Sequence, residues 1–409
     1  MRNAILSLSL IAIILCGCSQ SHTLSKSGKN QVSENTSNKV YQRIVDSVRQ
    51  QFVPDSRVNV FDVKVQYSDG KTVLKGVTTL AEAKTELVNR MQAENQNIAD
   101  SITVLPEKSL GDEIFGIVTL SVASMRTSGN YSAEMATQAL LGMPVKILQN
   151  GSWLRVQTPD GYISYTYSGN IKKMNKQQFN EWISSPKIIF TENCGFAYIE
   201  PDSKDIVSDL VAGNMLKLEG ETEHYYKVSY PDGRIAYVNK KQSQKTSEWF
   251  ASVNLTGDNI ATYGKRFMGT PYLWGGTSPK AMDCSGFVKT VYFMHGIILQ
   301  RDASQQYYTG QPINIDSDFA NLQIGDLLFF GAKAQNGKKE RIGHVGIYIG
   351  DRQFIHEATQ VKTGSLDPAS PNYDKYNAGR LVRASRITGN IDTKGITTIK
   401  SNEFYQQQK

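Results

Sequence analysis

The sequence predicts a multidomain α+β protein, and three observations support this fold class. The chain has 409 residues, which is enough for about three domains of ordinary size. Apolar residues make up 40% of it and charged residues 20%, so ordinary hydrophobic cores can form. A strand-rich segment also occurs twice, because residues 153–165 (WLRVQTPDGYISY) match residues 225–237 (YYKVSYPDGRIAY).

The N-terminus predicts export and membrane attachment. Residues 5–15 form an apolar run behind Arg2, which is too short to cross a bilayer and is typical of a secretory signal. Residues 15–18, Leu-Cys-Gly-Cys, resemble a bacterial lipobox. We therefore expect residues 1–17 to be removed and Cys18 to carry a lipid anchor, with an ordinary secretion signal as the alternative. The protein would then lie in the cell envelope, facing the periplasm or the outer surface.

A tether and a small domain are predicted next. Residues 18–38 are polar and lack apolar periodicity, which predicts a flexible tether. Residues 39–110 show helical spacing up to Pro54, two alternating stretches, a second helical stretch and a last strand, which predicts an αββαβ domain. This order resembles the BON-type envelope domain. Because we find no chemical constellation in it, we interpret it as a spacer or docking module.

The repeated segments predict two small β-barrels. In each copy, alternating apolar residues run into a Pro-Asp-Gly hairpin turn, at Pro159 and at Pro231. The pattern resembles bacterial SH3-like domains, and we place them at residues 111–180 and 181–245. Cys194 has no His near it in sequence, so we interpret it as a structural thiol that contributes to packing.

The chemistry is predicted in the last domain, at residues 246–390. A linker over residues 240–254 is predicted to precede it, and a tail over residues 391–409 to follow it. Apolar residues at helical spacing behind Cys284 predict a helix that starts there, with Asp283 as its N-cap. The free N–H groups and the dipole of a helix start favour a thiolate and can stabilise the oxyanion of an attacked carbonyl.

Two of the five histidines complete a nucleophilic arrangement. His344 and His356 lie in the segments HVGIYIG and QFIHEA, each a predicted strand. A hairpin would bring both imidazoles together, so that one takes the proton of Cys284 while the other holds it in the productive tautomer. Buried core histidines and a zinc site are the alternatives. Because a redundant set of metal ligands is missing, we expect no metal and no cofactor.

Five ordered motifs resemble the NlpC/P60 family of papain-like cysteine peptidases. They are Pro271-Tyr272-x-Trp274-Gly275-Gly276, Asp283-Cys284-Ser285-Gly286-Phe287, Arg301-Asp302-Ala303 with Gln306, Gly325-Asp326-Leu327 and His344-Val345-Gly346-Ile347-Tyr348. The resemblance implies a papain-like NlpC/P60 catalytic domain with Cys284 as nucleophile, His344 as general base and then acid, and His356 as the orienting residue. Residues 299–301 read Leu-Gln-Arg where the family more often has Leu-Pro-Arg, a departure that involves no catalytic residue.

The tandem SH3-like units resemble those of family members that cut murein stem peptides between γ-D-glutamate and a diamino acid, and that require a free N-terminal L-Ala. This resemblance implies substrate contacts from residues around the nucleophile: Tyr272, Asp283 and Ser285. A desolvated ammonium needs a carboxylate partner, which suits Asp283. Further candidates lie in the first SH3-like unit: Glu134, Tyr162 and Tyr165. We interpret Arg301, Asp302 and Gln305 as structural.

The function expected from the sequence is a lipid-anchored cysteine endopeptidase that forms a thioester on Cys284 and acts on murein peptides as a monomer. Two other classes stay open. One is a non-catalytic wall-binding lipoprotein that works through its SH3-like pair, and the other is an acyltransferase on a papain-like fold. The net charge of +7 is mild and we find no uninterrupted basic tract, so we do not expect nucleic acid as a partner.

Overall fold

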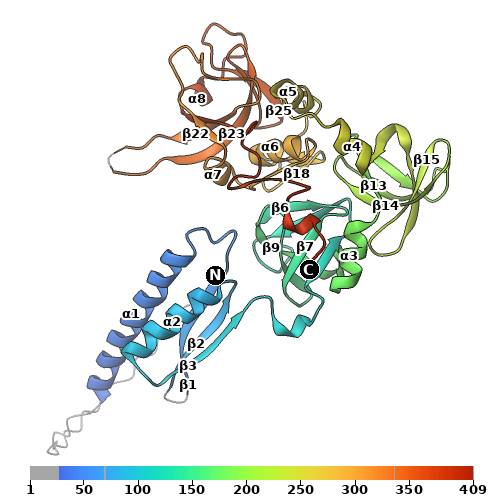
Figure 1. Ribbon diagram of the computed structural model, residues 1–409. Coiled ribbons are helices and arrows are strands. Elements are labelled where there is room, and N and C mark those ends of the chain that lie inside the picture. The colour runs from blue at the N-terminus through green and yellow to red at the C-terminus, as the bar shows by residue number, and fades with distance from the viewer. Residues whose placement is uncertain (1–26, 69–70, 336, 409) are drawn as a thin grey trace, which may run out of the picture.

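The computed structural model describes residues 27–68, 71–335 and 337–408. Figure 1 shows a small N-terminal unit, two sheet-rich units in the middle of the chain, and a C-terminal unit that mixes helices and strands. The predicted signal at residues 1–17 and the anchor at Cys18 lie outside the described residues. In the part of the chain that the structure describes, no helix is both long and apolar enough to cross a membrane.

The N-terminal unit has the predicted α-β-β-α-β order of elements. These are α1 (Ser27–Phe52), β1 (Phe61–Ser68), β2 (Lys71–Thr78), α2 (Ala81–Glu94) and β3 (Ile98–Val104). Strand β2 pairs antiparallel with β1 and parallel with β3, and the two helices lie side by side (Figure 1). Val45, Leu74 and Leu87 are fully buried in the shared core. The similarity to BON-type domains stays a prediction.

The start of α1 corrects the predicted tether. The sequence predicts flexibility over residues 18–38, but the helix already begins at Ser27. Helix propagation adds one hydrogen bond for each residue that it fixes, so a helix that packs through later residues can extend into a polar segment. Val45 and Val48 supply that packing. A missing apolar pattern before residue 39 therefore does not exclude a helix.

Two seven-stranded antiparallel sheets follow, and they share one strand order. The first contains β4 (Phe115–Val118), β5 (Val122–Arg126), β6 (Met135–Leu140), β7 (Pro144–Gln149), β8 (Trp153–Gln157), β9 (Ile163–Tyr167) and β10 (Ile171–Met174). After α3 (Lys176–Ser184), the second contains β11 (Lys187–Phe190), β12 (Gly195–Tyr198), β13 (Ile206–Leu210), β14 (Met215–Glu221), β15 (Tyr225–Ser229), β16 (Ile235–Asn239) and β17 (Ser243–Lys245). The orders are β10-β4-β7-β8-β9-β5-β6 and β17-β11-β14-β15-β16-β12-β13, so the repeat in the sequence is also a repeat of topology.

Two segments between elements differ from their predictions. The predicted linker over residues 240–254 contains β17, which pairs with β11, and α4 (Thr246–Ser252). Trp249 of α4 is buried and Phe250 packs against the same core, and these two side chains fix a segment that otherwise reads as polar. Cys194 is exposed rather than packed, because it lies in the turn between β11 and β12.

The C-terminal unit is built on a six-stranded antiparallel sheet of order β21-β26-β22-β23-β24-β25. Its strands are β21 (Gln311–Ile313), β22 (Leu327–Ala332), β23 (Arg341–Gly350), β24 (Gln353–Glu357), β25 (Val361–Ser365) and β26 (Leu381–Arg386). Its helices are α5 (Gly257–Lys265), α6 (Cys284–Phe293), α7 (Ala303–Gln306) and α8 (Lys375–Ala378), and β18 (Thr277–Ser278) pairs with β19 (Ala281–Met282). Helix α6 packs on the sheet, where Phe287 and Val291 share a core with Val345 and Ile355.

The predicted tail at residues 391–409 is part of the folded structure. Strand β27 (Ile396–Thr398) pairs with β20 (Ile297–Leu299). The Nδ2 group of Asn402 donates to the carbonyl of Pro159 in the first SH3-like unit at 2.9 Å. Ile399 is buried in a core that residues of that unit share with other units, and Ile396 is buried in the core of the C-terminal unit. These two isoleucines hold the segment in place.

Candidate active site

The candidate nucleophile Cys284 is the first residue of α6, as predicted. The side chain of Asp283 accepts a hydrogen bond from the backbone N–H of Gly286 at 2.8 Å, which confirms the predicted N-cap. A Cβ atom on Gly286 would lie 1.9 Å from the carbonyl oxygen of Gly276. The glycine-rich loop therefore packs directly on the first turn of the helix.

The charge state of the thiol differs from the prediction. Burial, and then the negative charge of Asp283, raise the pKa of Cys284 to about 12. Backbone hydrogen bonds from Val345 and Ser285 act in the opposite direction but do not compensate. The free enzyme therefore holds a thiol rather than the thiolate that a helix start alone would favour.

The two histidines meet as the predicted hairpin requires. His344 on β23 and His356 on β24 are separated by 2.8 Å between Nε2 of the first and Nδ1 of the second. Burial lowers the pKa of His344 to about 3, with a contribution from His356, and burial also lowers the pKa of His356 to about 4. Both imidazoles are thus neutral at neutral pH.

Asp374 extends the pair on the far side. Its Oδ2 atom lies 3.8 Å from Nε2 of His356. The tautomer of His356 with its proton on Nε2 directs that proton toward this carboxylate and lets Nδ1 of His356 accept from Nε2–H of His344. In this tautomer Nδ1 of His344 carries no proton and is available as a base. Val345, which follows His344 on β23, lies beside the thiol of Cys284.

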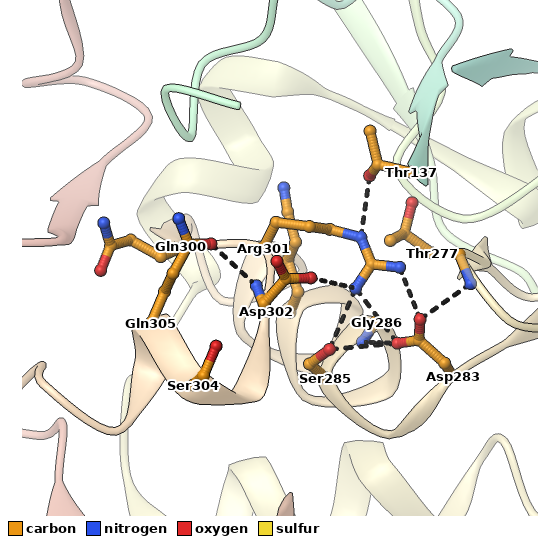
Figure 2. Close-up of polar contacts among 12 residues, drawn as sticks. Thr137, Thr277, Asp283, Ser285, Gly286, Gln300, Arg301, Asp302, Ser304 and Gln305 are labelled. Carbon is orange, nitrogen blue, oxygen red and sulfur yellow. Dashed lines mark hydrogen bonds and ion pairs between the residues drawn. The ribbon is translucent and has the colours of Figure 1, made fainter. Parts of the chain in front are cut away.

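Arg301 is the centre of a polar cluster at the start of α6 (Figure 2). Its side chain is 1% exposed, and Nη2 lies 2.6 Å from Oδ2 of Asp283. Nη1 donates to Asp283 and to the hydroxyl of Ser285, and Nε donates to Thr137 of β6 at 3.0 Å. The interpretation of Arg301 as structural fits these contacts, since it joins the start of α6 to the first SH3-like unit. The oxygens of Asp283 also accept from Gly275, so this carboxylate is already well supplied with donors.

A cleft of about 360 Å³ opens above Cys284. Its lining comes from the N-terminal unit, the first SH3-like unit and the C-terminal unit: Arg57, Thr127, Glu134, Ala136, Tyr162, Trp274, Gly275, Asp283, Cys284, Ser285, Arg301, Asp302, Ala303, Ser304, Ile342 and Gly343. Oε1 of Glu134 accepts from the indole N–H of Trp274 at 2.6 Å. Burial, and then the negative charge of Asp302, raise the pKa of the Tyr162 hydroxyl.

Two of the predicted substrate contacts, Tyr165 and Tyr272, are not among the residues that line this cleft. Tyr165 does not line this cleft within the described residues, because its side chain lies on β9 beneath the guanidinium of Arg155, at 5.2 Å. Tyr272 is 36% exposed and lies near the nucleophile, where Cys284 and Asp283 contribute to the raised pKa of its hydroxyl after burial. It stands beside the cleft rather than in its lining.

The first SH3-like unit packs closely on the loop before the nucleophile. Gly275 has a φ of +81°, and a Cβ atom there would lie 2.3 Å from the carbonyl oxygen of Met135 on β6. The backbone N–H of Thr277 donates to Oε1 of Gln138 at 2.9 Å. The Trp-Gly-Gly motif therefore serves an interface as well as a tight loop.

Sequence reasoning missed three residues at or beside the site. Glu357 is fully buried and its carboxyl has no hydrogen-bond partner among the described residues, and burial, followed by Asp283, raises its pKa to about 8. An acid next to His356 in an apolar strand is a signal that could have identified it. Asp374 and Arg57 carry no such signal, because they reach the site from segments without a pattern.

Comparisons with known proteins identify the family of the chain. A family model described as the NlpC/P60 family matches residues 269–386, and one described as a bacterial dipeptidyl-peptidase Sh3 domain matches residues 125–166. The gamma-D-glutamyl-L-lysine dipeptidyl-peptidase of Bacillus cereus is 31% identical over 254 residues, which span 60% of this chain and 74% of that relative. The chain belongs to the NlpC/P60 family. It is thus a cysteine peptidase, as the sequence predicts.

Two further relatives cover a similar share of the chain. Dipeptidyl-peptidase 6 of Lysinibacillus sphaericus is 28% identical over 63% of this chain and 93% of its own length. A crystal structure of an NlpC/P60 family protein from Bacillus cereus aligns with a TM-score of 0.56 at 25% identity, over 66% of this chain and 99% of that one. The predicted combination of an NlpC/P60 domain with an SH3-like domain is confirmed. Both family matches leave out the N-terminal unit.

Among the described residues, no group of three or more His, Cys, Asp or Glu side chains is arranged to hold a metal ion.

Proposed function

We propose that this NlpC/P60 peptidase hydrolyses the bond between γ-D-glutamate and a diamino acid in murein stem peptides with a free N-terminal L-Ala. Relatives named for gamma-D-glutamyl-L-lysine cleavage support the bond type. The observation that carries the proposal is Glu134, a carboxylate that Trp274 holds in the lining of the cleft that contains Cys284. It offers a partner for an ammonium at one end of a short substrate.

The proposed chemistry uses Cys284, His344 and His356. The Cys284 sulfur attacks the γ-carbonyl carbon while its proton passes to Nδ1 of His344. His344 returns this proton to the leaving amine of the diamino acid, and the C–N bond breaks to leave a thioester on Cys284. Water then attacks the thioester with His344 as base, which releases the γ-carboxylate and restores the thiol. His356 holds the tautomer of His344 throughout.

The raised pKa of Cys284 gives this scheme a definite starting point. Because the thiol and the imidazole are both neutral at rest, proton transfer accompanies attack rather than preceding it. The backbone N–H of Gly286 donates to Asp283, so the N–H groups of Cys284 and Ser285 in the first turn of α6 are the candidates to stabilise the oxyanion that forms. A substrate that excludes water from the cleft strengthens both effects.

The test compares the wild type with the Cys284→Ala variant on L-Ala-γ-D-Glu-L-Lys and on the diaminopimelate analogue, read by mass spectrometry. We expect the wild type to release L-Ala-γ-D-Glu from at least one peptide, and the variant to leave both intact. The N-acetylated peptide should be cleaved far more slowly. Intact free-amine peptide in the wild-type sample would reject the proposed bond.

We also propose that the mature protein is attached to a membrane through a lipid on Cys18 and faces the periplasm or the outer surface of the envelope. The lipobox-like residues 15–18 support this proposal. Labelling of expressing cells with an alkyne-tagged fatty acid tests it. Cys18→Ser should lose the label, whereas Cys16→Ser should keep it. Equal labelling of both variants would exclude Cys18 as the anchor.

A further inference from the structure

The N-terminal unit contributes a side chain to the cleft. Arg57 lies in the loop between α1 and β1, and it is part of the same lining as Cys284 and Glu134. Its backbone carbonyl accepts from the N–H of Ile163 in the first SH3-like unit at 2.7 Å. The Nε2 group of Gln305 in the C-terminal unit donates to the neighbouring Asp55 at 2.9 Å. The loop is thus bound to both walls of the cleft.

The guanidinium of Arg57 is held firmly in one orientation. Nε and Nη2 donate to the two oxygens of Asp55 at 2.8 and 2.9 Å. Nη1 donates to Oδ2 of Asp302 at 2.9 Å and to the hydroxyl of Ser304 at 2.8 Å. A guanidinium has five N–H donors, so these four bonds leave one N–H of Nη2 for a ligand. A fixed arginine loses little entropy when it binds.

Arg57 differs from Arg301, the second arginine in the lining. Arg301 is 1% exposed and is already bonded to Asp283, whereas the Arg57 side chain is 34% exposed. The carboxylate of Asp302 contacts both, since Oδ1 lies 4.0 Å from Nη1 of Arg301 and Oδ2 accepts from Nη1 of Arg57. Its charge is therefore shared by two arginines. Among the described lining residues, Arg57 is the cation that a solute can reach.

We propose that Arg57 binds the free α-carboxylate of the γ-linked glutamyl residue, an inference that rests on the proposed function. A glutamate linked through its γ-carbon keeps its α-carboxylate, so such a substrate carries an anion close to the scissile carbonyl and an ammonium farther away. Glu134 offers the partner for the ammonium, and Arg57 offers the partner for the carboxylate. The N-terminal unit then acts in substrate selection and is more than a spacer.

The experiment uses two peptides and two arginine variants of the full mature chain. The peptides are L-Ala-γ-D-Glu-L-Lys and its D-isoglutamine analogue, in which a carboxamide replaces the α-carboxylate. We expect Arg57→Ala to lower kcat/KM for the carboxylate peptide on the order of tenfold or more, mainly through KM. It should change kcat/KM for the carboxamide peptide less than about twofold, because a neutral amide has no charge to lose.

Arg155→Ala is the matched control. Arg155 also joins the N-terminal unit to the first SH3-like unit, through an ion pair with Asp62 at 2.8 Å, but it lies outside the cleft lining. This variant should treat both peptides like the wild type. Equal losses on both peptides in Arg57→Ala would overturn the proposal and make Arg57 a residue that only holds the units together. An unchanged value for the carboxylate peptide would overturn it as well.

Binding measurements separate this proposal from the proposed function. Calorimetry on Cys284→Ala, with and without Arg57→Ala, measures affinity for both peptides without cleavage. We expect only the carboxylate peptide to bind more weakly when Arg57 is replaced. If the wild type cleaves neither peptide, the proposed function fails, while a binding difference confined to the carboxylate peptide still supports Arg57. If neither peptide binds, both fail.

Discussion

The first and second SH3-like units differ in what their corresponding segments contact. Between β5 and β6 the first unit carries Glu134, which accepts a hydrogen bond from Trp274 at the cleft. The corresponding segment of the second unit, between β12 and β13, carries Asp202, which accepts from Tyr225 of its own unit at 3.0 Å. One strand order therefore supports two roles, and the connecting segments decide between them.

The second unit supports the first one. The N–H of Met215 donates to the carbonyl of Leu141 at 2.9 Å, and a Cβ atom on Gly142 would lie 2.1 Å from the carbonyl oxygen of Met215. The first unit is thus held between the second unit and the loop around Gly275. The second copy of the fold therefore supports the first copy, which lines the cleft.

The largest difference in stability should appear between removal of Arg301, which contacts the first unit, and removal of Arg234 from the second unit. Arg301→Ala breaks the buried pair with Asp283 and the bond to Thr137 of the first unit, and we expect a loss of about 3–5 kcal/mol in unfolding free energy. Arg234→Ala in the second unit breaks a part-exposed pair with Asp232 and one bond to the carbonyl of Thr119, and should cost about 1 kcal/mol. Denaturant titrations of both variants measure the contrast. Equal losses would show that burial at Arg301 does not matter.

A smaller effect on stability, with a large effect on activity, should follow from Gly275→Ala. The new Cβ atom would collide with the carbonyl of Met135 and push the first unit away from the nucleophile. We expect peptide cleavage to fall on the order of a hundredfold. The control is Gly220→Ala in the second unit, where a Cβ atom meets nothing within 4 Å. Steady-state kinetics should find that control unchanged, and an active Gly275→Ala enzyme would argue against close docking.

The pH dependence of stability should differ in sign between Glu357 and Glu221. Burial raises the pKa of Glu357 from 4.5 to about 8, so the folded state holds this proton more tightly, and stability falls as pH rises through that window. Bonds to Lys240 and Lys245 lower the pKa of Glu221 in the second unit to about 2, so its contribution is lost as pH falls from 4.5 toward 2.

Thermal melts of each variant at two pH values of its own test these two glutamates. Glu357→Gln should match the wild type at pH 4.5 and gain about 1–3 kcal/mol at pH 8, because the variant has no proton to lose. Glu221→Gln should lower the melting temperature slightly at pH 7 and not at pH 2. A gain for Glu357→Gln that is the same at both pH values would contradict the raised pKa.

The sequence predicted what local patterns encode. Asp283 and Cys284 at a helix start, the hairpin that joins His344 to His356, and the repeated topology all depend on neighbours along the chain. The predicted preference of Cys284 for a thiolate does not hold, because burial raises the pKa of the thiol more than the helix start lowers it.

Other features arise from contacts between distant segments. Arg57 lines the cleft from a loop that carries no periodic pattern. Tyr165 lies outside the lining, and Arg155 on the neighbouring strand covers its ring. The segment after residue 390 joins the fold through two isolated isoleucines, Ile396 and Ile399. Single side chains of this kind give no periodic signal, so only the folded chain shows where they lie.

The most direct measurement of the central claim, that the first SH3-like unit completes the substrate site, is the activity of Glu134→Gln on L-Ala-γ-D-Glu-L-Lys and on its N-acetylated form. In the wild type we expect strong preference for the free amine. In the variant, kcat/KM for the free-amine peptide should fall on the order of tenfold or more, while the value for the acetylated peptide stays the same. A variant that keeps the full wild-type preference would contradict a role for this unit in recognising the substrate.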